Sequence, residues 1–180
     1  MKKLFFALFI SLFSLCLHAQ NVLISKNAAI SFFSSTPAED IEGKSNTASS
    51  ALDIKSRNIL VKVSNTSFQF KKKLMQEHFN ENYMESDKYP VSAFRGKITD
   101  NVDLSKDGTY NVTINGTLDV HGVTKAYQTK AILVVDKGTI TAKTAFNIKI
   151  ADHKIEIPSI VFTKIAETVN VRIAAVYQPK

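Results

Sequence analysis

The chain has 180 residues, of which 44% are hydrophobic, with 12 phenylalanines and no tryptophan; this suffices for one domain with a sizeable core. Its formal charge is +7. The lysines are dispersed along the chain and an export signal, described next, precedes them; both features argue against nucleic acid as a partner. The single cysteine excludes an internal disulfide framework.

The first segment is typical of a secretory signal peptide. Lys2 and Lys3 precede an apolar run, and Ala19 supplies a small residue at the expected cleavage site. The run is too short to span a bilayer comfortably. We therefore expect residues 1–19 to be removed and residues 20–180 to form a single domain in the periplasm.

Cleavage would change both the charge and the cysteine content. It removes Lys2, Lys3 and Cys16, which leaves 21 basic against 16 acidic side chains, a net charge of +5. This excess suits transient contact with an anionic membrane surface; the alternative is an ordinary solvated surface. A lipoprotein acylated at Cys16 is a further alternative, which Leu15 disfavours because a small residue is needed there.

Most of the remaining sequence alternates between apolar and polar residues, as β-strands do. The alternation is clearest over 111–120 and 140–150, where Val, Ile and Thr are frequent. Further strands are predicted at 29–35, 41–54, 58–64, 92–102, 123–136 and 167–177. About eight strands can close into a barrel that holds one ligand.

Short turns separate several of these strands. Lys-Asp-Gly at 106–108, Asp-Lys-Gly at 136–138 and His-Gly at 121–122 lie between alternating runs. Glycine accepts the backbone angles that tight hairpins require. Successive strands joined in this way predict an all-β, antiparallel, up-and-down sheet.

The exception is the segment 70–84, FKKKLMQEHFNENYM. Its apolar residues fall along one face of a short helix, and Pro90 ends it before the next strand. We predict a short helix between the third and fourth strands, lying across one end of the barrel. Leu74, Met75 and Phe79 would then act as a lid, with Met75 adaptable in shape; the alternative is a simple plug that completes the core.

Residues 116–125, Gly-Thr-Leu-Asp-Val-His-Gly-Val-Thr-Lys, resemble the motif of a known family. The pair His-Phe at 78–79 and Lys-Tyr-Pro at 88–90, followed by Phe94, are similar to the family's short helix, turn and next strand. From about residue 27 to 177 the chain thus resembles the YceI-like, lipid- or polyisoprenoid-binding family. The resemblance implies a lipocalin-like antiparallel barrel whose lumen takes an amphiphile with a long isoprenoid or acyl chain.

Two places depart from the family pattern. Met-Gln-Glu at 75–77 stands where members often carry an Arg-Asp pair, and 151–158 replaces the usual Asn-Arg-x-x-Phe-Gly signature. Both lie at expected rim or end-closing positions. They therefore bear on contacts with the ligand's head group more than on the barrel.

Three histidines remain after cleavage, His78, His121 and His153, and we place them at the lid or rim. They form no His-x-His or His-x-x-x-His pair, so we expect no metal and no cofactor. His121 is expected to form a turn with Gly122 and to bond a nearby backbone group. With no Gly-x-Ser-x-Gly elbow, no phosphate-binding glycine loop and no mature cysteine, we expect no catalytic residues and no enzyme activity.

The apolar face inside a small barrel either packs as a core or lines a cavity for a ligand. Periodicity alone leaves both open and slightly favours packing, whereas the family resemblance favours the cavity. The residues predicted to line the lumen are Phe32, Phe94, Ile98, Val112, Ile114, Leu118, Ile132, Phe146, Ile148, Val171 and Ile173.

The leading hypothesis is a periplasmic binding or carrier protein for a long-chain apolar lipid of the polyprenol or quinone type. Burying each methylene contributes about 0.8 kcal/mol, so burial of a long chain can account for the affinity without a chemical reaction. A membrane surface is a transient partner, and an imperfectly closed barrel would leave a strand edge for a homodimer. The alternatives are a stress-protective or interaction barrel with a packed lumen, and a metal- or haem-associated redox accessory.

Overall fold

The alternating sequence folds into one antiparallel sheet of nine strands. The computed structural model describes residues 21–159 and 163–179, so the predicted signal peptide lies outside the described residues. In chain order the strands are β1 (Val22–Ser35), β2 (Asp40–Asp53), β3 (Asn58–Ser64), β4 (Gln69–Phe70), β5 (Val91–Ile98), β6 (Gly108–Val120), β7 (Val123–Asp136), β8 (Thr139–Lys149) and β9 (Thr168–Pro179).

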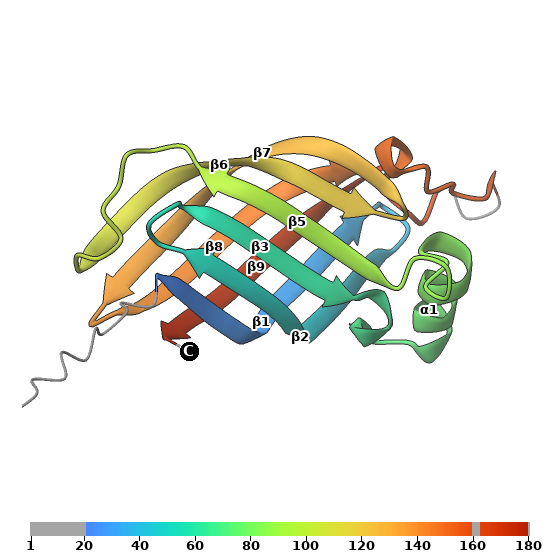
Figure 1. Cartoon of the computed structure of the whole chain (residues 1–180). Helices are drawn as coiled ribbons and strands as arrows, with labels where there is room; N and C mark the ends of the chain where they lie inside the picture. Colours follow the sequence, from blue (N-terminus) through green and yellow to red (C-terminus); the bar gives the residue numbers. More distant parts are fainter. Residues whose placement is uncertain (1–20, 160–162, 180) are drawn as a thin grey trace, which may run out of the picture.

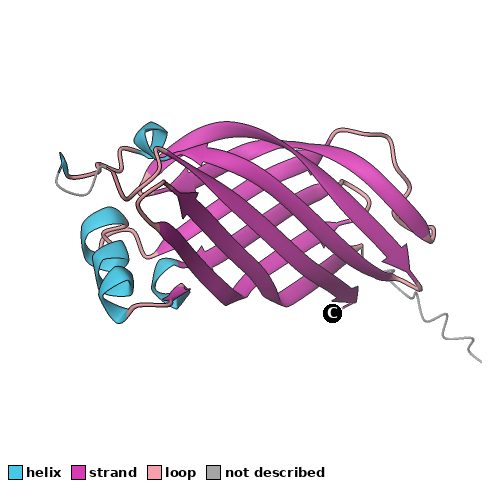
Figure 2. Cartoon of the chain, turned by 180° about the vertical axis from the view of Figure 1, so that it is seen from behind, coloured by secondary structure: helices cyan, strands magenta, loops and turns pink. Residues whose placement is uncertain are grey.

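The sheet closes into a barrel because β1 pairs with both β9 and β2. The order is β1-β9-β8-β7-β6-β5-β3-β2, and the two-residue strand β4 pairs with β2 outside this ring. Figures 1 and 2 show the eight-stranded wall from opposite sides. The predicted fold class, an antiparallel up-and-down barrel of about eight strands, is confirmed.

Closure of the ring removes the premise of the homodimer prediction. That prediction requires an imperfectly closed barrel with an unpaired edge, and every long strand of the described chain has a partner on both sides. Backbone groups that are already paired cannot add a strand from a second copy. The homodimer prediction therefore loses this argument and stays a prediction.

Two of the predicted turns are two-residue hairpin loops. His121 and Gly122 have φ values of 53° and 68°, and Lys137 and Gly138 have 47° and 79°. Positive φ at both central residues is the geometry of a type I′ turn, whose twist matches that of paired strands. These turns join β6 to β7 and β7 to β8, and they set the register of three neighbouring strands.

The third predicted turn, at 106–108, is the end of a longer connection. The strand predicted over 92–102 stops at Ile98, and residues 99–107 link β5 to β6. The Asp100 carboxylate accepts a hydrogen bond from the backbone N–H of Thr113, and Asp103 accepts bonds from Ser105. These side-chain bonds compete with a continued strand ladder.

Strand β1 begins at Val22, seven residues before the predicted start of 29. The pairing of β1 with β2 shifts register on both sides of Ala28. Such bulges put two residues opposite one and break the strict alternation by which a strand is recognised. The sequence pattern therefore hides the first half of this strand.

The predicted helix is present but shorter than 70–84. Helix α1 (Lys73–His78) runs directly into a π-helical turn, η2 (Phe79–Tyr83), while Phe70 belongs to β4. Figure 1 shows α1 across one end of the barrel, which we call the helical end. The short helices η1 (Asn65–Ser67) and η3 (Ile150–His153) follow β3 and β8 at the same end. We call the opposite end, where β1 begins and β9 finishes, the terminal end.

Inward-facing side chains fill the half of the barrel nearest the terminal end. Leu52, Ile98, Leu133 and Ile140 are all less than 2% exposed. The hydroxyl of Tyr177 lies 2.7 Å from Ser50 Oγ, so the buried phenol is hydrogen-bonded. This half of the lumen is a packed core.

Candidate functional site

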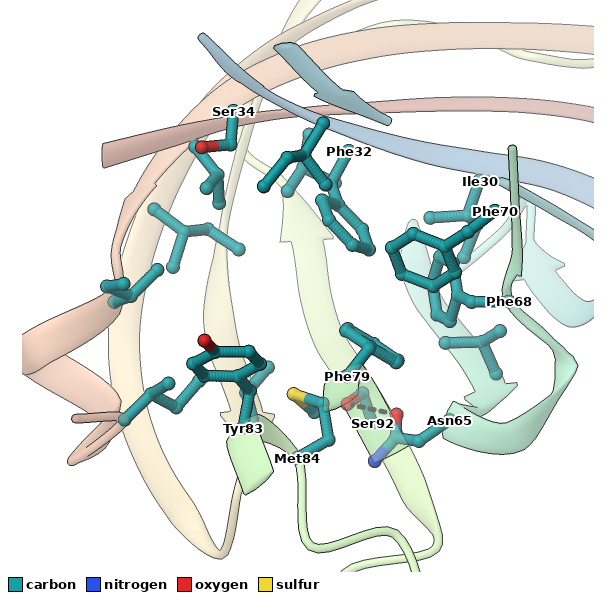
Figure 3. A pocket seen from close by; sticks show the side chains of 18 of the residues that line it. Ile30, Phe32, Ser34, Asn65, Phe68, Phe70, Phe79, Tyr83, Met84 and Ser92 are labelled. Carbon is teal, nitrogen blue, oxygen red and sulfur yellow. Dashed lines mark hydrogen bonds between the residues drawn. The ribbon is translucent and has the colours of Figure 1, made fainter. Parts of the chain in front are cut away.

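An apolar cavity of about 440 Å³ occupies the half of the lumen nearest the helical end. Strands β1, β2, β3, β5, β6, β8 and β9 contribute its wall, and β4, α1 and η2 cover it. Figure 3 labels lining side chains from β1, β4, β5 and η2 around the hollow. Voids larger than a water molecule are few in protein interiors, so a cavity of this size indicates a binding site.

Seven of the residues predicted to line the lumen lie on the wall of this cavity: Phe32, Phe94, Leu118, Phe146, Ile148, Val171 and Ile173. Three others, Ile98, Val112 and Ile114, belong to the packed half and are at most 5% exposed. Alternation identifies the inward face of a strand but not how far along the barrel a residue lies. It therefore could not separate these two groups.

The prediction that Ile132 faces the lumen is wrong. Ile132 is 49% exposed, whereas its neighbours Ala131 and Leu133 are 4% and 1% exposed. The segment 131–135 is apolar at every position, so the sequence does not show which residues face inward. A shift of one residue exchanges the two faces of a strand.

Four phenylalanines, which we call the mouth cluster, close the cavity at the helical end: Phe32, Phe68, Phe70 and Phe79. The ring of Phe79 lies 5.3 Å from that of Phe32, 5.5 Å from that of Phe68 and 5.0 Å from that of Phe70, between centroids. Aromatic pairs at such distances add about 0.5–1.5 kcal/mol beyond their burial. Phe79 therefore fastens the helical segment to the barrel.

Gly43 of β2 makes room for the mouth cluster. A Cβ atom at this position would lie 2.5 Å from Cε1 of Phe32 and 3.0 Å from Cζ of Phe70. Gly43 pairs with Phe32 of β1 and with Phe70 of β4, so its missing side chain lets two rings approach the strand. Phe68 and Phe70 are missed by the sequence pattern, which assigns Phe70 to the helix and gives Phe68 no distinct face.

The predicted lid residues Leu74, Met75, His78 and Phe79 all lie at the cavity. Leu74 is 60% exposed, and α1 contributes no buried residue. A segment with so little burial opens at a lower free energy than the strands below it. It is suited to act as a lid and contributes little to the core.

Three polar side chains inside the mouth, Asn65, Ser92 and Ser34, are already hydrogen-bonded within the protein. Asn65, which is fully buried, accepts a hydrogen bond of 2.8 Å from Ser92 Oγ and donates one of 2.6 Å to the carbonyl of Tyr89. Ser34 Oγ accepts a bond from the backbone N–H of Ala166. Because these groups are satisfied, the cavity offers a ligand mainly apolar contact.

Charged side chains are confined to the rim. Lys72 Nζ lies 2.8 Å from Glu39 Oε1, and the hydrogen bond from Lys72 is the main cause that lowers the pKa of the Glu39 carboxyl. Lys164 lowers the same pKa by its charge. All three line the cavity together with His78, so a ligand's polar head would meet charges only at the mouth.

His121 ties the lid segment to the barrel from the outside of the cavity. Its Nε2 lies 2.7 Å from Glu85 Oε2, just after η2, and its Nδ1 lies 3.1 Å from the carbonyl oxygen of His153. Both partners are hydrogen-bond acceptors, and each ring nitrogen of His121 faces one of them. The ring of Tyr89 packs edge-on at 4.7 Å. The prediction that His121 forms a turn with Gly122 and bonds a backbone group is confirmed.

The prediction that His153 lies at the rim is wrong, because its side chain is fully buried. Its Nδ1 donates to the carbonyl of Val123 at 2.9 Å, and its Nε2 lies 3.1 Å from the hydroxyl of Tyr127. Burial, and secondly the charge of Asp152, raises the pKa of Tyr127. The Tyr127 hydroxyl therefore keeps its proton and can donate it to His153 Nε2. This set of bonds anchors η3 to β7 and has a structural role.

Within residues 21–159 and 163–179, no three His, Cys, Asp or Glu side chains are grouped so that they could hold a metal ion. None of the helices in that part of the chain is long and apolar enough to cross a membrane.

Comparison with known families is decisive. The model of the YceI-like domain matches residues 22–177. The chain belongs to the YceI-like family. No curated protein matches this YceI-like chain significantly.

Solved structures share the fold of this YceI-like barrel at low sequence identity. A polyisoprenoid binding domain from Saccharophagus degradans, implicated in plant cell wall breakdown, has a TM-score of 0.76 and 18% identity over 89% of this chain and 99% of its own. Burkholderia cenocepacia BcnA has a TM-score of 0.68 and 18% identity over 83% and 95%. The Campylobacter jejuni YceI protein has a TM-score of 0.61 and 19% identity over 77% and 84%.

Proposed function

We propose that this YceI-like protein binds a single lipid with a long apolar chain, of isoprenoid or acyl type, inside its barrel and carries or sequesters it chemically unchanged. The observation that carries the proposal is the apolar cavity of about 440 Å³ beneath an aromatic lid. Pockets for small ligands span about 300–1,000 Å³ and are mostly apolar with a few polar groups. The structural relative from Saccharophagus degradans, a polyisoprenoid binding domain, supports the same class of ligand.

The lipid would lie with its chain in the cavity and its polar head at the rim. The wall offers apolar side chains, whereas Lys72, Glu39 and Lys164 stand at the mouth. Each buried methylene contributes about 0.8 kcal/mol, and a charged head left outside avoids desolvation. This arrangement provides affinity without any catalytic group.

The proposal extends to where the protein works. The signal-like segment 1–19 favours export to the periplasm. There the mature net charge of +5 would assist transient contact with an anionic membrane, from which a lipid could be taken. The packed-lumen alternative describes the terminal half of the barrel but does not account for the cavity in the helical half.

Lipid extraction tests this proposal. We would purify the mature protein from its native periplasm, extract it with organic solvent and identify the released molecules by mass spectrometry. A stoichiometric isoprenoid or long-chain lipid is the expected result. A protein that releases no lipid, and shows no thermal shift with long-chain quinones, polyprenols or fatty acids, would overturn it.

A matched pair of variants on β9 makes the test specific to the cavity. Ile173→Trp places a large ring in the hollow, whereas Val176→Trp places it on the outer face, where Val176 is 49% exposed. We expect Ile173→Trp to release the lipid and Val176→Trp to retain it. Equal retention by both variants would show that the lipid binds elsewhere.

A further inference from the structure

The cavity has a floor formed by two aromatic rings. Phe94 of β5 and Phe146 of β8 both line it, with ring centroids 6.4 Å apart. Towards the terminal end, the next inward-facing residues are packed: Ile98 is fully buried and Ile114 is 5% exposed. The cavity is therefore blind, and a ligand chain cannot pass through the barrel.

Two glycines hold the ring of Phe94 in this position. Gly96 of β5 and Gly116 of β6 are directly opposite each other in the sheet. A Cβ atom at Gly96 would lie 2.6 Å from Cε1 of Phe94, and one at Gly116 would lie 2.7 Å from its Cζ. The space that two side chains would normally fill is thus taken by the ring, which lies against the wall where the cavity ends.

The depth of the cavity follows from the strands that line it. On β9 its wall runs from Ile173 to Val169, and on β8 from Phe146 to Ile148 with Ile150 just beyond the strand. Four residue steps at about 3.3 Å each give roughly 13 Å along the strand, about a third of the length of the twelve-residue β9. Only part of a very long chain could be buried at this depth.

We propose that Phe94 sets the length of the apolar chain that the protein accepts, and that its ligands are single-chain amphiphiles whose tail ends on this ring. The inference rests on the proposed function, because it assumes that the chain enters from the mouth with its head at the rim. Carbons beyond this length remain outside the cavity and add little affinity. The protein would then favour lipids of limited chain length over full-length polyprenyl chains.

Binding of a homologous series tests the inference. Straight-chain fatty acids from about 8 to about 22 carbons, and isoprenoid alcohols of about 10 to 20 carbons, would be titrated into delipidated protein. For the wild type we expect affinity to rise about four-fold per added methylene and then to level off at a defined length. For Phe94→Ala the levelling-off should move to longer chains, because removal of the ring opens the space over Gly96 and Gly116.

Two further variants keep the result interpretable. Gly96→Ala should push the ring towards the open cavity and move the levelling-off to shorter chains, the opposite direction. Leu133→Ala, in the packed half and away from the cavity, loses comparable buried volume and should leave the length dependence unchanged. It therefore controls for destabilisation, and Gly96→Ala provides the test if Phe94→Ala fails to fold.

The outcomes separate the two proposals. Wild-type protein that binds neither these series nor a long-chain quinone or polyprenol would overturn the proposed function itself, whereas binding of full-length polyprenyl chains alone would overturn the length limit. Wild-type protein that binds both series, with a levelling-off that neither Phe94→Ala nor Gly96→Ala moves, would leave lipid binding intact and overturn the role of Phe94.

Discussion

The two halves of the barrel lumen are enclosed by the same strands, yet one is packed and the other is hollow. In the terminal half, aliphatic side chains such as Leu52 and Leu133 belong to one buried hydrophobic cluster that excludes solvent. In the helical half, the strands leave a cavity that β4, α1 and η2 must cover with aromatic rings. The alternation of apolar and polar residues along each strand thus makes the inner wall apolar. Whether the lumen is filled depends on the sizes of the inward-facing side chains at each position along the barrel axis.

The largest expected difference between the halves is in stability. Leu133→Ala in the packed half should lower the free energy of unfolding by about 2–5 kcal/mol, because it leaves a cavity in a dense core. In the hollow half, the side chain of Ile173 already faces empty space and makes fewer contacts. Ile173→Ala should therefore lower the free energy of unfolding clearly less than Leu133→Ala does. Urea denaturation of both variants checks this, and equal losses would contradict the division of the lumen.

Asn65→Ala tests how the mouth is held together. The change strips Ser92 Oγ and the Tyr89 carbonyl of their partner in a buried setting, which should cost about 1–3 kcal/mol of unfolding free energy. Ser64→Ala, one residue earlier on an exposed side chain, is the control and should have almost no effect. If Asn65→Ala were equally harmless, the polar pairing at the mouth would not be structural.

Glu85→Gln sharpens the comparison by loosening only the lid. The change removes the charge that faces His121 Nε2 at 2.7 Å; because Glu85 is partly exposed, we expect roughly 0.5–1 kcal/mol. Amide hydrogen exchange should quicken across residues 73–83 and stay unchanged in β6 to β9. Glu81→Gln, an exposed acid in η2, controls for charge alone. Faster exchange throughout the barrel would contradict the prediction that the Glu85–His121 interaction stabilises only the lid.

The smallest expected effect concerns the pH dependence of the packed half. Burial raises the pKa of Tyr177 above its ordinary value of 10.0, although its bond with Ser50 opposes this. As pH rises, the Tyr177 hydroxyl therefore loses its proton in the unfolded chain before it does so in the folded protein. The contribution of the protonated hydroxyl to the free energy of unfolding is complete below about pH 10 and is lost as pH rises towards the folded pKa. Between about pH 8 and pH 11, the melting temperature should fall less steeply with pH for Tyr177→Phe than for the wild type. Identical slopes would contradict the assignment.

Sequence periodicity predicts the strands well and the site only in part. The strands at 58–64 and 123–136 and the turn at 121–122 follow directly from alternation and glycine placement. Alternation cannot assign Ile132 in a run that is apolar throughout, nor separate Ile98 from Phe94 along the barrel axis. The mouth cluster depends on Gly43 bringing two strands' rings together, which is a contact between distant segments that no local pattern encodes.

The location of the chain ends has a practical consequence. Leu23 of β1 pairs with Pro179 of β9, so the first and last described strands lie side by side at the end of the barrel opposite the mouth. A fusion partner or surface anchor attached there would leave the lid unobstructed. A short linker could also join 179 to 22, with new ends cut among the exposed residues 105–107, because insertions and new termini are best tolerated in exposed loops. The protein is thus suited to immobilisation with the mouth of its cavity facing the solution.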